Sequence, residues 1–260
     1  MKAIILGDVV GRPGRTVLNE LLKRLRDEHE AEFVVANVEN AAAGAGIIPR
    51  VGEEILQAGV DVMTSGNHVF DKKDALEYIE KNLRLLRPAN YPPDSPGRGV
   101  WLGSTVSGTP VAVINIQGRV FMPPNDCPFR TVDRLVTELR SRATVLIVDH
   151  HAEATSEKVA MGRYLDGRVS VVVGTHTHVQ TSDAGLLPRG TAFITDAGMT
   201  GPHDSVIGVE AELAIRRMRT GLPVRFETAR GGVRIEGALI ECDAETGKAS
   251  SIEAVRVPFP

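Results

Sequence analysis

The sequence predicts an α/β fold with mixed sheets, in which two packed β-sheets are flanked by helices. Short apolar strands alternate with amphipathic helices over the first 82 residues and again over residues 131–178, as in parallel βα units. Strand pairs joined by turns lie between and after these units, and they indicate antiparallel neighbours. One domain over residues 1–260 is the simplest account, although 260 residues would also fit two small domains.

The composition is that of a globular protein with an aliphatic core. Hydrophobic residues make up 42% of the chain and aromatic residues only 4%. The net charge of −3 supports neither a membrane nor a nucleic-acid partner, so RNA has no support from charge. We expect a cytoplasmic protein, because no signal sequence and no apolar run of about 18 residues is found. Cys127 and Cys242 have no Cys or His neighbour at metal-ligand spacing and should be free thiols.

Strands and helices are expected to alternate over the first 82 residues. Three apolar runs of strand length cover 2–8, 32–40 and 60–68. Segments with helical periodicity or helix-boundary residues follow each run, over 14–29, 49–59 and 71–82. The second of these helices starts with Pro49 and ends in Gly59, which are typical boundary residues, and Asp71 is a suitable N-cap for the third.

The second part of the chain begins with a loop rich in proline and glycine, residues 87–99. Two strands joined at Gly108 follow, and then a second series of βα units. Their expected bounds are strands 99–108, 110–118, 143–151 and 169–178, with helices 131–142 and 155–167. Residues 224–257 are predicted to form three strands, with one turn at a Gly-Gly pair and another near Glu245.

Polar groups follow five of the apolar strands, and the carboxyl ends of parallel strands form the ligand crevice of an open α/β sheet. The groups are Asp8; Glu39 with Asn40; Asn67 with His68; His150 with His151; and His176 with His178. On a strand, alternate residues point to the same side, so His176 and His178 should address one site. Each group alone would have an ordinary explanation as a turn, a helix cap or a strand-end histidine. Their coincidence at five strand ends favours one common site.

The side-chain types in this set predict a metal site. Carboxylate, amide and imidazole groups without thiolate suit Mn, Fe or Zn. The set is too large for one tetrahedral ion, and one carboxylate can bridge two ions. The glycines of "GDVVGRPGR", residues 7–15, match neither the P-loop nor the dinucleotide fingerprint, so Asp8 is the functional residue of that segment. His203 lies in a Gly/Pro loop that could approach the site.

Six longer motifs resemble the YmdB-like bacterial subfamily of the calcineurin-like metallophosphoesterases. They are "GDVVGRPGR", "NVENAAAG", "SGNHVFD", "HAEATSEK", "VGTHTHVQT" and "ITDAGMTGP". The resemblance implies a four-layer αββα sandwich, a dinuclear metal site and hydrolysis of 2′,3′-cyclic nucleotides. Iron or manganese would be the preferred metals, with zinc as a further fit.

The resemblance also implies a role for each residue. Glu39 would bridge the two metals. The coordination of one metal would be completed by Asp8, Asn40 and His178. The coordination of the other would be completed by Asn67, His151 and His176. A hydroxide that bridges the metals would attack phosphorus, and His68 would protonate the leaving group.

Three positions depart from related patterns. The broader family has Asp-x-His at the first strand, whereas Val10 stands here, so Asn40 is expected to replace that imidazole. The broader family also has Asp where Glu39 stands. His150 occupies a position that is usually bulky and apolar in the subfamily. Because strand neighbours point to opposite sides, His151 is the expected ligand and His150 a supporting residue.

Two other functions fit the same sequence. One is a phosphomonoesterase, either a protein phosphatase or a nucleotidase, because the ligand set does not distinguish these substrates. The other is a non-enzymatic, metal-loaded regulatory protein that binds a nucleotide or RNA. The sequence fixes neither the metal, nor the physiological substrate, nor the number of subunits, and a homo-oligomer is compatible with it.

Overall fold

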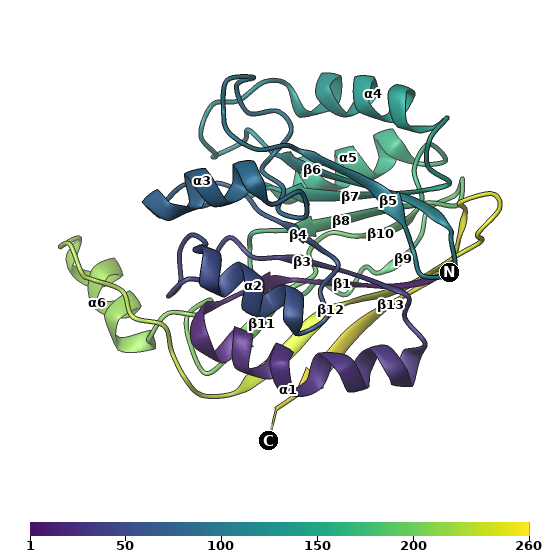
Figure 1. Ribbon diagram of the computed structural model, residues 1–260. Coiled ribbons are helices and arrows are strands. Elements are labelled where there is room, and N and C mark those ends of the chain that lie inside the picture. Colours follow the sequence, from purple (N-terminus) through teal and green to yellow (C-terminus); the bar gives the residue numbers. More distant parts are fainter. Residues whose placement is uncertain (260) are drawn as a thin grey trace.

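The computed structural model describes residues 1–259 and confirms the four-layer α/β architecture. Two mixed sheets pack face to face, and helices cover both outer faces (Figure 1). The seven-stranded sheet contains β1 (Lys2–Leu6), β2 (Asp8–Val9), β3 (Phe33–Asn37), β4 (Val62–Thr64), β11 (Met199–Pro202), β12 (Val233–Cys242) and β13 (Ala249–Pro258). The six-stranded sheet contains β5 (Val100–Ser104), β6 (Pro110–Gln117), β7 (Val145–His151), β8 (Val171–Thr175), β9 (Gly185–Leu186) and β10 (Ala192–Ile194).

The helices form the two outer layers. They are α1 (Gly11–His29), α2 (Pro49–Gln57), α3 (Lys73–Lys81), α4 (Pro128–Leu139), α5 (Thr155–Leu165) and α6 (Ala211–Thr220). The first three contribute buried side chains to the core against the seven-stranded sheet, and α4 and α5 cover the six-stranded sheet. Helix α6 belongs to neither layer and projects to one side in Figure 1.

Parallel pairing at the centre of each sheet positions the strand ends. Strand β1 pairs in parallel with β3, and β3 with β4. In the other sheet β6, β7, β8 and β10 run parallel, while β5 and β9 are antiparallel edge strands. The polar residues that follow β3, β4, β7 and β8 therefore emerge at the carboxyl edges of two packed sheets.

Strand β1 shows how one sequence serves two layers. Ile4 and Leu6 pack into the core under the helices, whereas Ala3 and Ile5 face the second sheet. Both faces are buried, which explains why this strand is a continuous apolar run rather than an alternating one.

The structure corrects several predicted boundaries. Helix α1 begins at Gly11 rather than at residue 14, with Pro13 in its first turn. Residues 224–230, the first of the three predicted C-terminal strands, form no strand, and only an isolated bridge joins Thr228 to Val209. Helix α6 was not predicted, although Ala211, Ala214, Ile215 and Met218 recur at the i, i+3, i+4, i+7 spacing of a helix. Of its residues, only Ala214 is buried. The very short strands β9, β10 and β11 were also missed, since two to four residues carry no periodicity.

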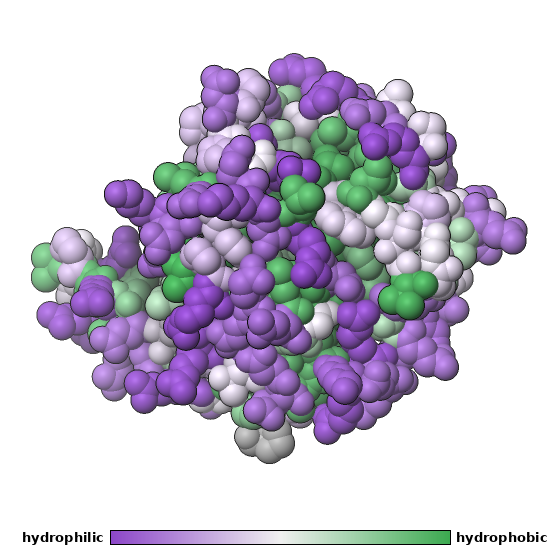
Figure 2. Space-filling view, in the orientation of Figure 1, coloured by the Kyte–Doolittle hydropathy of each residue, from purple (hydrophilic) through white to green (hydrophobic). Residues whose placement is uncertain are grey.

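The face of the molecule in Figure 2 is mainly polar, with scattered apolar groups. Among residues 1–259, no helix combines the length and apolar character that a bilayer span requires. Cys127 and Cys242 are both free thiols, as predicted.

The core between the sheets should tolerate truncation poorly. Ile147 is fully buried there, so Ile147→Ala should lower the free energy of unfolding by about 2–5 kcal/mol. Ile215→Ala on α6, where the side chain is 48% exposed, is the matched control and should change it little. Urea denaturation of both variants measures the difference, and equal effects would contradict this packing.

Candidate metal centre

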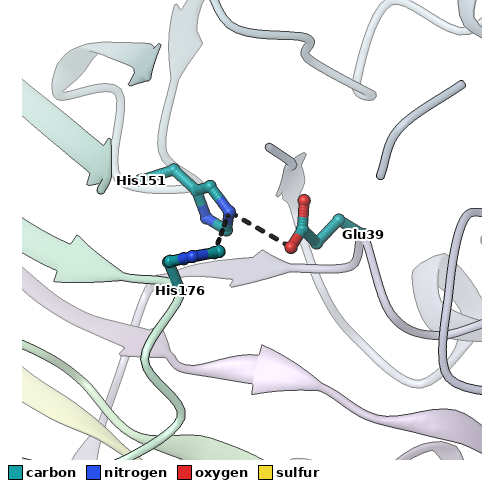
Figure 3. Close-up of side chains that lie close together, drawn as sticks. All are labelled: Glu39, His151 and His176. Carbon is teal, nitrogen blue, oxygen red and sulfur yellow. Dashed lines mark hydrogen bonds and ion pairs between the residues drawn. The ribbon is translucent and has the colours of Figure 1, made fainter. Parts of the chain in front are cut away.

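One group of ligand side chains converges on His151. Its Nε2 atom lies 3.1 Å from Glu39 Oε1, 3.3 Å from Asn67 Oδ1 and 3.0 Å from His176 Nδ1. Figure 3 shows the Glu39, His151 and His176 side chains pointing toward one another from different strand ends. Ligand atoms of these three residues lie within 4.8 Å of one another, as for a common ion.

A second group converges on His178. Its Nε2 atom lies 3.1 Å from the Asn40 side-chain amide and 3.6 Å from Asp8 Oδ1. Rotation of the Asn40 amide by 180° would exchange its nitrogen for its oxygen and present an acceptor to a cation. These are the three residues that were predicted to share one metal.

Glu39 connects the two groups. Its Oε1 atom contacts His151 and accepts a hydrogen bond of 3.3 Å from Asn40, while Oε2 accepts one of 3.0 Å from the backbone N–H of His68. The carboxylate is 1% exposed. The seven predicted ligands therefore form two contact groups with Glu39 between them.

The spacing and the buried charge both fit divalent cations. Ligands at about 2.0–2.2 Å from an ion lie roughly 3.0–3.5 Å apart. The contacts that His151 and His178 make within the two groups span 3.0–3.6 Å, close to that spacing. Asp8 Oδ1 is buried and has no hydrogen-bond partner among the described residues. A buried carboxylate oxygen of this kind costs free energy unless a cation or donor meets it. Asp8 Oδ2 is already satisfied by the backbone N–H of His176, at 3.0 Å.

Each histidine is oriented through the ring nitrogen that faces away from the ligand group. His151 Nδ1 lies 3.0 Å from Thr175 Oγ1, which itself donates to Asp149 at 2.7 Å. His178 Nδ1 donates to the Ile207 carbonyl at 2.8 Å. Such contacts fix the ring orientations and point Nε2 of both rings at the ligand groups, where a bound metal would displace the Nε2 proton.

His176 is oriented through its other nitrogen by a residue that the sequence analysis missed. The Glu153 carboxylate lies 3.0 Å from His176 Nε2, so Nδ1 faces the ligand group. Glu153 lies in "HAEATSEK", two positions after His151, and its place beside a strand-end histidine was the available signal.

The predicted strand geometry of His176 and His178 is wrong, although both rings reach the site. Strand β8 ends at Thr175, and the two histidines adopt φ values of 100° and 63° in the turn that follows. The Asp196 carboxylate holds this turn, because it accepts hydrogen bonds from the backbone N–H and the hydroxyl of Thr177. The turn, not strand alternation, brings both rings to one side.

The Asp196 carboxylate is in turn paired with the buried ammonium group of Lys158. Lys158 Nζ lies 2.5 Å from Asp196 Oδ2, and both side chains are 1% exposed. Sequence analysis missed both residues, because Lys158 looks like an ordinary helix lysine and Asp196 follows the short strand β10. The pair links α5 to the turn that carries the two histidine ligands.

His68 lines a cavity beside the two ligand groups and is more exposed than the three predicted histidine ligands. Its side chain is 42% exposed, and Nδ1 lies 2.7 Å from Asp71 Oδ2. Asp71 was predicted as an N-cap, but α3 begins at Lys73 without a side-chain cap. Asp71 therefore orients His68 and leaves its Nε2 available to a ligand in the cavity.

Three other positions are outside the ligand groups. Val10 is buried against Gly201 and Gly208 and offers no ligand atom. His150 points to the opposite face of β7 from His151, as predicted, and its ring makes no hydrogen bond within residues 1–259. Burial lowers the pKa of His150 to about 3, so the ring is neutral. His203 donates to the Met199 carbonyl at 3.0 Å and does not join the site.

The charges in the site are strongly coupled. Burial opposes ionisation of Asp8, but His178, His151 and the backbone N–H of His176 together outweigh it and hold the pKa of Asp8 well below its usual range. Burial likewise opposes a charge on His178, yet Asp8 raises the pKa of this imidazole to about 9. For His176, burial and then His151 lower the pKa to about 4, so this ring is neutral near pH 7. The carboxylates are thus ionised and attract positive charge.

The sequence model of the YmdB-like protein family matches residues 4–255. The chain belongs to the YmdB-like family. A relative from Bacillus subtilis (strain 168), named 2′,3′-cyclic-nucleotide 2′-phosphodiesterase, is 46% identical to this YmdB-like chain over 257 residues, covering 99% of the chain and 97% of the relative. A Mycoplasma pneumoniae relative, named putative phosphatase/phosphodiesterase, is 35% identical over 263 residues, 99% of this chain and 93% of its own length.

Solved structures share the fold of this YmdB-like chain. A hypothetical protein from Thermus thermophilus superposes with a TM-score of 0.94 and 42% identity, covering 100% of both chains. A novel phosphatase from Mycoplasma pneumoniae superposes with a TM-score of 0.93 and 34% identity, covering 99% of this chain and 93% of that one.

The buried Lys158–Asp196 pair should be essential for stability. Lys158→Met leaves the Asp196 carboxylate without its cation and should lower the free energy of unfolding by about 3–5 kcal/mol. Lys23→Met, at an exposed position on α1, is the matched control. Urea denaturation of both variants tests this, and a loss no larger than that of the control would show that Asp196 is compensated in another way.

Proposed function

We propose that this YmdB-like chain is a dinuclear metal-dependent phosphodiesterase that hydrolyses 2′,3′-cyclic nucleotides. The observation that carries the proposal is the position of Glu39, whose carboxylate contacts a member of each ligand group. The printed name of the B. subtilis relative supports the substrate class. Iron and manganese suit the ligand set best, and zinc is a further candidate.

The protein contributes charge and orientation to this chemistry. Divalent ions, when bound, would supply Lewis acidity, a nucleophile from water at neutral pH and charge stabilisation on the phosphoryl oxygens. Asp8 and Glu39 provide the buried negative charge that retains cations. Glu153 and the Ile207 carbonyl hold two of the imidazoles in ligand orientation, which limits rearrangement during turnover.

His68 is proposed as the general acid. Its Nδ1 contacts Asp71 Oδ2, which orients the ring and leaves Nε2 as the atom from which a proton would pass to a leaving oxygen. The backbone N–H of His68 is also bound to Glu39, which fixes this proton donor relative to the ligand groups. In a 2′,3′-cyclic phosphate, the departing group is a ribose oxygen, which needs that proton.

A second candidate activity is phosphomonoester hydrolysis, because one M. pneumoniae relative is named putative phosphatase/phosphodiesterase and a solved M. pneumoniae structure is named a novel phosphatase. A panel of 2′,3′-cyclic nucleotides, nucleoside monophosphates and phosphopeptides separates the two activities. We expect turnover of the cyclic nucleotides in protein purified anaerobically and analysed for metals. Two bound metals without activity on any phosphoester would favour the regulatory alternative.

Glu39→Gln should lose metal and activity together. The substitution keeps the side-chain shape but removes the charge between the two ligand groups. We expect a lower metal content in elemental analysis and a loss of at least about 100-fold in kcat/KM for a cyclic nucleotide. Glu253→Gln, at an exposed position on β13, should change neither quantity. Full metal content in Glu39→Gln would refute the bridging role.

His68→Ala should separate catalysis from metal binding. The ring lies outside the two ligand groups, so metal content should stay near that of the wild type. Loss of the proton donor should lower kcat about 10²- to 10⁴-fold. His29→Ala, at the end of α1, is the control histidine variant. A His68→Ala enzyme that turns over at the full rate would exclude His68 from the mechanism.

A further inference from the structure

The cavity beside the ligand groups is lined partly by apolar side chains, which the binding of a phosphate alone would not require. Its volume is about 530 Å³, within the range of about 300–1,000 Å³ typical of small-molecule sites. Its polar lining includes Glu39, Asn40, His68, His176 and His178. Apolar side chains complete it: Val10, Ala43, Ala45, Ile207, Val209 and Phe226. The apolar part indicates that the natural ligand carries an organic group next to its phosphate.

Phe226 and Arg217 form a stacked pair in this cavity. The guanidinium carbon of Arg217 lies 5.0 Å from the centre of the Phe226 ring, a cation–π distance. Arg217 comes from α6, and Phe226 from the segment that returns from α6 toward β12. Helix α6 projects from the rest of the molecule (Figure 1). We call residues 211–228, which comprise α6 and the segment that follows it, the arm; the pair lies on this arm and lines the cavity beside the strand ends.

Two glycines let the Phe226 segment approach the site. A Cβ atom at Gly11 would lie 2.8 Å from Thr228 Cγ2, and one at Gly44 would lie 3.2 Å from Thr228 Oγ1. Gly11 follows the Asp8 strand, and Gly44 follows the Glu39–Asn40 segment. Thr228 therefore packs closely against the two chain segments that supply these ligands. Phe226, two residues earlier, lines the same cavity.

The chemistry of the pair suits a flat π system. Phe226 is 42% exposed, so much of its ring is free for contact. Of the described residues that line the cavity, Arg217 is the only arginine or lysine, which is few for a site that recognises charge alone. Aromatic rings and guanidinium planes are the groups on which unpaired nucleobases stack.

We propose that Phe226 and Arg217 form a nucleobase platform, which holds the base of the substrate while its phosphate lies at the two ligand groups. The platform rests on the proposed function, because it assigns the base of a cyclic nucleotide to the apolar part of the cavity. Stacking tolerates every base, so the platform senses the presence of a base rather than its identity. It is a substrate-binding site, with no part in the chemical step.

The test compares two substrates that differ only in the base. They are adenosine 2′,3′-cyclic phosphate and methyl ribofuranoside 2,3-cyclic phosphate, which has no base. Phe226→Ala should lower kcat/KM for the nucleotide by about 5- to 150-fold and leave kcat/KM for the baseless substrate within about twofold. Phe226→Trp should restore the nucleotide rate. Met218→Ala, on the same arm at a 77% exposed position that does not line the cavity, is the control.

A binding measurement separates the platform from the proposed function. Calorimetric titration of adenosine 2′,3′-cyclic phosphate into His68→Ala protein gives the affinity without turnover, and adding Phe226→Ala should weaken it by the same factor. If Phe226→Ala lowered kcat/KM equally for both substrates, or left the affinity for the nucleotide unchanged, the platform would be wrong. The proposed phosphodiesterase activity would still stand. A wild type that is inactive on both substrates but binds the nucleotide through Phe226 would overturn the function and support the platform.

Discussion

Two buried carboxylates set the constraint on which the rest of this structure depends. Asp8 and Glu39 are at most 1% exposed and lie where the two sheets meet. Negative charge in such a place is stable only if donors and cations surround it. The backbone N–H groups of His68 and His176 and the nearby imidazoles supply part of this compensation. Asp8 Oδ1 accepts no hydrogen bond from the described residues, and the His178 imidazole faces it at 3.6 Å.

The same constraint explains the layer of support around the ligands. Lys158 neutralises Asp196, Asp196 holds the turn at Thr177, and this turn presents two imidazoles to the carboxylates. A ligand that is fixed by buried partners need not reorganise when its metal binds. The polar residues behind the ligand groups thus help to hold the site in shape.

The features that could be predicted from the sequence are the buried strands, the amphipathic helices and the polar residues at strand ends. Buried strands and amphipathic helices follow from apolar spacing, and the seven predicted ligands meet because parallel strands end at one edge. The sequence could not predict the partners that come from distant segments. Glu153, Lys158 and Asp196 lie in the motifs "HAEATSEK" and "ITDAGMTGP", but their contacts arise only from tertiary packing. Helix α6 was overlooked for another reason: Ala211, Ala214 and Ile215 have helical apolar spacing, but the helix lies outside the predicted βα units and buries only Ala214.

The ligands come from both sheets and from distant parts of the chain, and this has a consequence for folding. The backbone N–H of His176 meets Asp8 across 168 residues of sequence, and Glu39 meets His151 from the other sheet. Contacts of such long range carry a high loop-closure entropy, which the packing of the whole fold must offset. The site therefore comes into existence only with the docked pair of sheets. An isolated half of this protein would keep its strands' sequence patterns but possess no metal centre.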